Sequence, residues 1–145
     1  MKTKNNDLTL INEVYRNAKT AILSIDAILS DVHEMYFFTE LKAQKDGYSA
    51  ILEEITTYMN DNGYTQNDVP PLKKTGMNFG IKMNTMFDSS TTHLAELMIN
   101  GTLMGIFELT RLINGGKTNN EDIINFARKL VDLEDNYESR LKKFL

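Results

Sequence analysis

Hydrophobic residues recur every three or four positions through most of this chain, and that spacing predicts helices rather than strands. The first stripe predicts a helix over about 8–30, with Asp7 placed to cap it. A second stripe predicts a helix over about 33–62, after which Gly63 can adopt the left-handed conformation that ends many helices. The link between these two helices is very short, so we expect them to be antiparallel neighbours.

Two further long helices follow a less regular stretch. Residues 72–87 keep apolar side chains at near-helical spacing despite two glycines, which predicts a short, loosely specified helix. Residues 89–114 predict a third long helix, apolar around most of its circumference, as is typical of a helix enclosed by a bundle or by a partner chain. The fourth helix begins near 119–120, where Glu121 and Asp122 suit its positive N-terminal end.

These elements predict an all-α fold, a four-helix bundle. The links are short, long and short, a pattern that predicts two antiparallel hairpins joined by a long crossover. A link of about 26 residues reaches about 80 Å when extended, which is enough to run the length of a bundle about 40 Å long. We expect residues 8–145 to form one domain and residues 1–7 to be disordered.

This arrangement resembles the ferritin-like four-helix-bundle superfamily. Within it, the sequence ITTYMNDNGY over 55–64 resembles the small bacterial bundle proteins of the spore coat protein F type, which pair a Tyr-Met turn of helix with a Gly-aromatic stop before the crossover. The resemblance implies a structural or protective bundle in a spore-forming bacterium, without established catalysis.

The composition narrows the possible partners. The 145 residues include 16 Lys+Arg against 20 Asp+Glu, a formal net charge of -4, which disfavours a large nucleic-acid footprint. The chain has no cysteine, so disulfides and thiolate chemistry are excluded. Neither a signal-peptide pattern nor an apolar run of membrane-spanning length is visible, so we expect a cytoplasmic protein without a membrane partner, or a spore protein as the resemblance implies.

Metal binding is a second possibility that the sequence raises. Di-metal ferritin-like proteins use Glu-x-x-His pairs, and this sequence has none, so we do not expect a di-iron centre. A weaker set remains: His93 and Glu96 share a helix face, hairpin geometry sets Glu138 level with His93, and a crossover brings His33 to the same end of the bundle. Such a set could hold Zn²⁺ or Mn²⁺. The alternative is a solvated helix end where His93 pairs with an acidic neighbour.

The third helix carries a second feature, a pair of glycines on one face. Gly101 and Gly105 would let another backbone approach closely, either in a tight crossing within one bundle or at a homodimer interface. We expect Tyr48 and Tyr137 to be buried, with their hydroxyls reaching Glu134, Gln44 or the edge of the bundle. Glu108 is expected to point inward, where it either pairs with a Lys or Arg or lies at a dimer edge.

The function expected from these features is that of a non-enzymatic bundle without a cofactor, which acts through self-association or a protein partner. The alternative is a metal-binding ferritin-like bundle with Zn²⁺ or Mn²⁺ at one end. A third possibility is a small apolar ligand in an interior rich in methionine. The four methionines concerned are Met83, Met86, Met98 and Met104.

Overall fold

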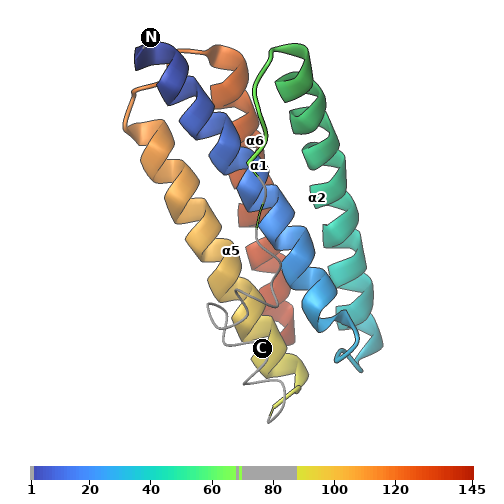
Figure 1. Cartoon of the computed structure of the whole chain (residues 1–145). Helices are drawn as coiled ribbons and strands as arrows, with labels where there is room; N and C mark the ends of the chain where they lie inside the picture. Colours follow the sequence, from blue (N-terminus) through green and yellow to red (C-terminus); the bar gives the residue numbers. More distant parts are fainter. Residues whose placement is uncertain (1, 68, 70–87) are drawn as a thin grey trace.

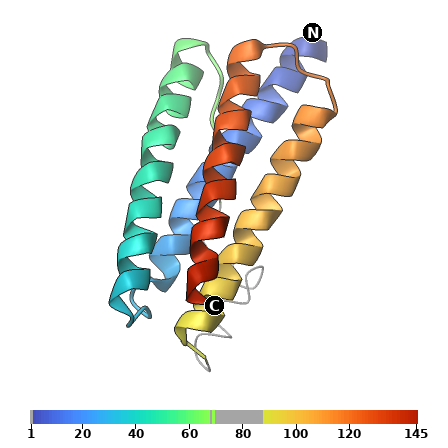
Figure 2. The same ribbon diagram turned by 180° about the vertical axis from the view of Figure 1, so that it is seen from behind.

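The computed structural model describes residues 2–67, 69 and 88–145, and within these ranges it contains four long α-helices (Figures 1 and 2). In chain order the helices are α1 (Lys2–Leu29), α2 (Met35–Asp61), α5 (Thr91–Asn114) and α6 (Glu121–Leu141), with the short 3₁₀ helix η1 (Lys142–Phe144) after them. The predicted all-α four-helix bundle is confirmed. The predicted helix at 72–87 lies outside the described residues. None of the helices described is both long enough and apolar enough to cross a membrane.

The chain forms two antiparallel hairpins and passes from one end of the bundle to the other between them. α1 pairs with α2, α5 pairs with α6, and α1 also packs against both helices of the second hairpin. α2 ends at the end of the bundle where α1 begins, whereas α5 begins at the opposite end (Figure 1). After α2 the chain turns back, and the backbone N–H of Asn67 donates to Asn12 Oδ1 at 3.3 Å. The end-to-end connection follows the predicted arrangement.

Local sequence sets the helix ends close to where the pattern predicts them. The side chains of Glu34, Ser90 and Asn120 accept hydrogen bonds from backbone N–H groups in the first turns of α2, α5 and α6. These contacts satisfy donors that have no partner within the helix. Gly63 and Gly116, with φ of 73° and 64°, close α2 and α5 in the left-handed conformation that glycine adopts without strain.

The N-terminus differs from the prediction. The helix α1 begins at Lys2 rather than near residue 8, and Asp7 lies buried within it rather than capping it. The expected disorder over 1–7 stays a prediction. Asn6 Nδ2 donates to the carbonyl of Lys117 at 3.2 Å, and Thr118 Oγ1 donates to the carbonyl of Asn6 at 3.1 Å. The α5–α6 turn therefore holds the first turns of α1, a long-range contact that local periodicity does not reveal.

The described residues of the bundle do not enclose α5 on all sides, so of its two predicted surroundings only the partner chain stays open as a prediction. Leu109 is fully buried, but Met104 and Phe107 are 67% and 63% exposed. The expected inward orientation of Glu108 is wrong, because its side chain is exposed. Its expected pairing with a Lys or Arg is met by Arg111 at 3.5 Å. The residues that the structure describes therefore leave one face of the most apolar helix uncovered.

Candidate functional site

A cluster of polar side chains occupies the interior of the bundle. It consists of Asn17 from α1, Tyr48 from α2, Thr102 from α5 and Glu134 from α6, and is called the polar centre below. Glu134 is only 1% exposed, and its Oε2 accepts a hydrogen bond from the Tyr48 hydroxyl at 3.2 Å. Every long helix therefore contributes one polar side chain, which fixes how the four helices are rotated about their axes.

Gly105 creates the room for this cluster. A Cβ at Gly105 would lie 2.7 Å from Asn17 Nδ2 and 3.1 Å from Glu134 Oε2, distances that a real side chain would not tolerate without a shift. Gly105 therefore faces the interior, and the close approach it allows is within one chain. Gly101 is half-buried on the same helix. The geometry at Gly105 therefore matches a tight crossing within one bundle rather than a homodimer interface.

Burial changes the protonation of the polar centre. It raises the pKa of the Glu134 carboxyl to about 8, while the hydrogen bond from Tyr48 and the neighbouring Asn17 side chain act in the opposite direction. Burial, followed by the charge of Glu134, also raises the pKa of Tyr48 well above its usual value of 10. At pH 7 Glu134 is therefore mostly protonated, and the cluster can exchange a proton near neutral pH.

Two atoms of the polar centre remain without a hydrogen-bond partner among the described residues. They are Glu134 Oε1 and Asn17 Nδ2. A buried polar atom without a full hydrogen bond costs about 1 to 3 kcal/mol, and the interaction between Asn17 and Glu134 offsets part of that cost. A neutral carboxyl lowers that cost because it avoids burying a charge.

A second layer of aromatic and polar contacts supports the centre. The Tyr137 ring meets the Tyr48 ring edge-on at 5.3 Å, and the Tyr137 carbonyl accepts a hydrogen bond from Gln44 at 3.4 Å. A Cβ at Gly47 would overlap the Tyr137 hydroxyl, so this glycine is needed for the contact. Tyr48 is buried as expected, and of the three possible neighbours of its hydroxyl the structure shows Glu134.

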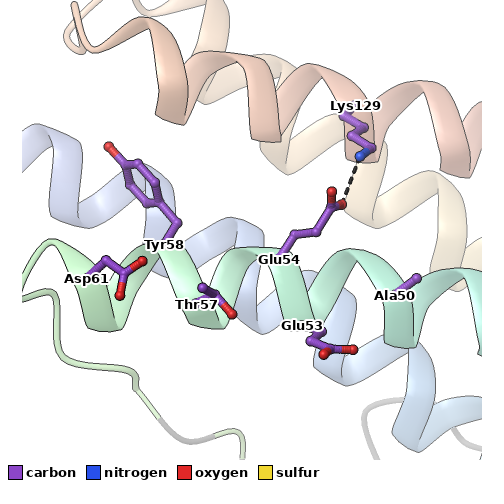
Figure 3. Close-up of a pocket in the computed structure, with 7 residues that line it drawn as sticks. All are labelled: Ala50, Glu53, Glu54, Thr57, Tyr58, Asp61 and Lys129. Carbon is purple, nitrogen blue, oxygen red and sulfur yellow. Dashed lines mark hydrogen bonds and ion pairs between the residues drawn. The ribbon is translucent and has the colours of Figure 1, made fainter.

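A shallow groove runs over the surface between α2 and α6 (Figure 3). Lys129 crosses it to reach Glu54 at 2.8 Å, and both side chains are more than half exposed. Tyr58 lies at one end, with its ring edge-on to Phe126 at 5.3 Å. The charged pair of this groove is well solvated, unlike the desolvated polar groups that orient a ligand in a built site, and we assign it no binding role.

The open face of α5 is the most distinctive surface feature. Met104 and Phe107 are one turn apart in the middle of the helix, so their side chains lie on the same face. The other strongly exposed apolar side chains of the described residues are at helix or chain ends rather than on a helix side. They are Met35, Tyr36, Phe38 and Leu145.

The four predicted metal ligands share one end of the bundle but do not form a group. The α1–α2 turn, the start of α5 and the C-terminal part of α6 lie at that end (Figures 1 and 2). His33 and Glu96 are exposed, and Glu138 pairs with Lys142 at 3.1 Å. Within the described ranges, no three His, Asp or Glu side chains are placed to share a metal ion. The Zn²⁺ or Mn²⁺ alternative thus gains no support from the geometry.

His93 lies at a helix end beside an acidic neighbour, as the alternative to a metal site predicts. Its Nδ1 lies 4.0 Å from Asp88 Oδ2, and its side chain is 23% exposed. Its Nε2 is buried and has no hydrogen-bond partner among the described residues. A histidine beside one acidic neighbour at a helix N-terminus is an ordinary element of a helix end.

Sequence reasoning missed Asn17, which the helical pattern placed on the polar side of the first helix. The available signal is its spacing: Asn17 follows Val14 by three positions and precedes Ala21 by four, which is the spacing of the buried stripe. A glycine on a facing helix, Gly105, provides the space that an inward asparagine needs. The two signals together would have identified the polar centre.

Comparisons with family models, curated proteins and solved structures found no match to this chain. The resemblance to ferritin-like and spore coat protein F-type bundles therefore stays a prediction.

Proposed function

We propose that this chain is a non-enzymatic helical bundle that works by self-association through the outer face of α5. The observation that carries the proposal is the exposure of Met104 and Phe107, at 67% and 63%, in the middle of a helix. Neighbouring apolar side chains on a helix side mark interaction surfaces more often than scattered ones do.

The polar centre supports this proposal by fixing the rotation of α5. Thr102 and Gly105 point into the bundle, where Gly105 contacts Asn17 and Glu134. Met104 lies between Thr102 and Gly105 in the sequence but at a different angle around the helix, so an inward Gly105 directs Met104 outward. The interior polar contacts and the exposed apolar face are therefore two consequences of one helix orientation.

The size of the face predicts a weak association. A helix of 24 residues is about 36 Å long and about 10 Å wide, which gives a footprint of about 360 Å² for α5 alone. Stable interfaces bury about 800 Å² per partner. We therefore expect a concentration-dependent dimer, with a dissociation constant of about 1 µM or weaker.

The test compares two identical substitutions at sites of similar exposure. Met104→Glu places a charge on the outer face of α5, whereas Met35→Glu places it at the start of α2, where the methionine is 76% exposed. Light scattering over about 10 to 500 µM should show the average mass of the unmodified chain and of Met35→Glu rising together. Met104→Glu should remain at the 16.6 kDa of a single chain.

Circular dichroism provides the control for folding, since Met104 is exposed and its replacement should leave the helical signal unchanged. A mass that stays at one chain throughout the concentration series for the unmodified protein would overturn the proposal. So would equal association of Met104→Glu and Met35→Glu.

A further inference from the structure

The outer face of α5 has the spacing of a helix-pairing seam. Leu97, Asn100, Met104, Phe107 and Arg111 follow one another at intervals of three, four, three and four residues. This spacing keeps a single line of side chains facing a partner helix, as in coiled coils. All five are exposed except Leu97, which is half-buried. The line is called the α5 seam below.

Charge is distributed unevenly along this seam. Glu96 lies beside its N-terminal half. The C-terminal half carries Arg111, which lies 3.5 Å from Glu108 of the same helix in an exposed pair, and Lys117 follows in the next turn. A parallel pair of α5 helices would place Arg111 against Arg111 of the second copy. An antiparallel pair instead places Arg111 of each helix near Glu96 of the other, and it opposes the two helix dipoles.

The apolar residues define the register of the antiparallel pair. Met104 and Phe107 are adjacent in the seam, so a two-fold axis between them places each Met104 against Phe107 of the second copy. Sulfur–aromatic contacts of this kind are favourable. The same two-fold axis sets Leu97 of one copy level with Asn114 of the other, and Asn100 level with Arg111. Glu96 lies about 6 Å from Asn100 along the helix, so the long Arg111 side chain of the other copy can reach it.

We infer that the partner of the α5 seam is a second copy of this chain, bound antiparallel about a two-fold axis between Met104 and Phe107, with Arg111 of each copy facing Glu96 of the other. The inference rests on the proposed function, because it names the partner geometry of the same surface. Each copy carries a formal charge of -4, so two copies repel at long range, and the local pairing of Arg111 with Glu96 offsets part of that repulsion.

Engineered cysteines test the register directly, because the chain has none of its own. Leu97→Cys and Asn114→Cys are made in separate chains, mixed, and oxidised under mild conditions. Antiparallel pairing brings these two positions together. Each position lies about 25 Å from the same residue of the second copy, which is far beyond disulfide reach. Mass spectrometry should find a yield of the mixed cross-linked dimer at least about tenfold above the yield of cross-linked Thr57→Cys dimer. Thr57 is an exposed position on α2, so its cross-linking measures random collision.

The outcomes separate the inference from the proposed function. Self-cross-linking of Leu97→Cys alone would mean a parallel pair and would overturn the inference while leaving self-association in place. An association that is lost in Met104→Glu but gives no cross-link above the collision control in any sample would overturn the register. A chain that remains a single copy by light scattering would mean that the proposed function itself has failed.

Charge reversal tests the pairing of Arg111 with Glu96. Arg111→Glu or Glu96→Arg alone should weaken the dimer about threefold to tenfold, because each places like charges across the interface. The double variant restores opposite charges and should recover the original dissociation constant. Additive weakening in the double variant would contradict the pairing.

Discussion

The stability of the bundle should depend on pH through Glu134, because burial raises the pKa of its carboxyl from 4.5 to about 8. A group that binds its proton more tightly in the folded state makes unfolding release a proton between these two pH values. The free energy of unfolding should therefore fall as pH rises through that window. At about 1.4 kcal/mol for each pH unit, the loss from Glu134 is on the order of 5 kcal/mol between pH 4.5 and pH 8.

Glu134→Gln removes this titration while keeping the size of the side chain and an oxygen that can accept from Tyr48. The glutamine stays neutral at every pH, so its protein should match the original near pH 5 and exceed it by several kcal/mol near pH 8. The matched control is Glu53→Gln on α2, where the side chain is exposed. Burial also raises the pKa of Glu13, but that group is present in all three proteins and cancels in the comparison.

Urea unfolding at pH intervals from 5 to 9 measures the effect. The original protein and Glu53→Gln should lose stability in parallel as pH rises, and the Glu134→Gln curve should be flatter. A curve for Glu134→Gln that falls as steeply as the original would refute the reasoning, because the pH dependence would then come from other groups. The three proteins keep the same outer face of α5 and are compared at one protein concentration, so any self-association contributes equally to each.

Three further substitutions test the interior and the metal alternative. Gly47→Ala should destabilise the fold by about 1 to 3 kcal/mol because its methyl group overlaps the Tyr137 hydroxyl, and adding Tyr137→Phe should recover most of the loss in thermal unfolding. Gly105→Ala should lower the free energy of unfolding by about 1 kcal/mol or more despite the better helix propensity of alanine, and Asn17→Ala in the same chain should reduce that loss. An equal loss with and without Asn17 would count against the contact. Calorimetry with Zn²⁺ or Mn²⁺ should give no heat that His93→Ala removes, and a heat lost in that variant would revive the metal hypothesis.

The helical plan could be predicted from sequence because each helix buries one stripe whose spacing is visible in the printed residues. Buried Leu41 and Ile55 on α2 and Leu130 on α6 lie where the three-and-four pattern places them. The end-to-end connection followed from the length of the link between the two hairpins. These features depend on local spacing and chain length, which a sequence displays directly.

Features that depend on contact between distant residues were predicted less well. Asp7 resembled a helix cap, but hydrogen bonds between Asn6 and the turn at Thr118 extend α1 beyond it. Met104 and Phe107 belong to a helix so apolar that the pattern could not show which side stays open. Composition identifies an apolar helix, but its rotation is set by Gly105 and the polar side chains around it.

The candidate metal residues show the same limit. The fold brought His33, His93, Glu96 and Glu138 to one end of the bundle, as the connectivity predicts, but the side chains have separate surroundings. Residues at the same end of a bundle can still lie far apart, because the distances between their side chains depend on how the helices pack. The burial of Tyr48 could be predicted because it lies on the apolar stripe of α2, whereas its partner Glu134 was one of three possibilities that spacing alone could not separate.

Sedimentation equilibrium of the unmodified chain at several hundred micromolar tests the central claim, that the open face of α5 joins two copies. The fitted mass should approach twice 16.6 kDa as concentration rises and return to that of a single chain on dilution. A mass that stays at 16.6 kDa at every concentration would contradict it.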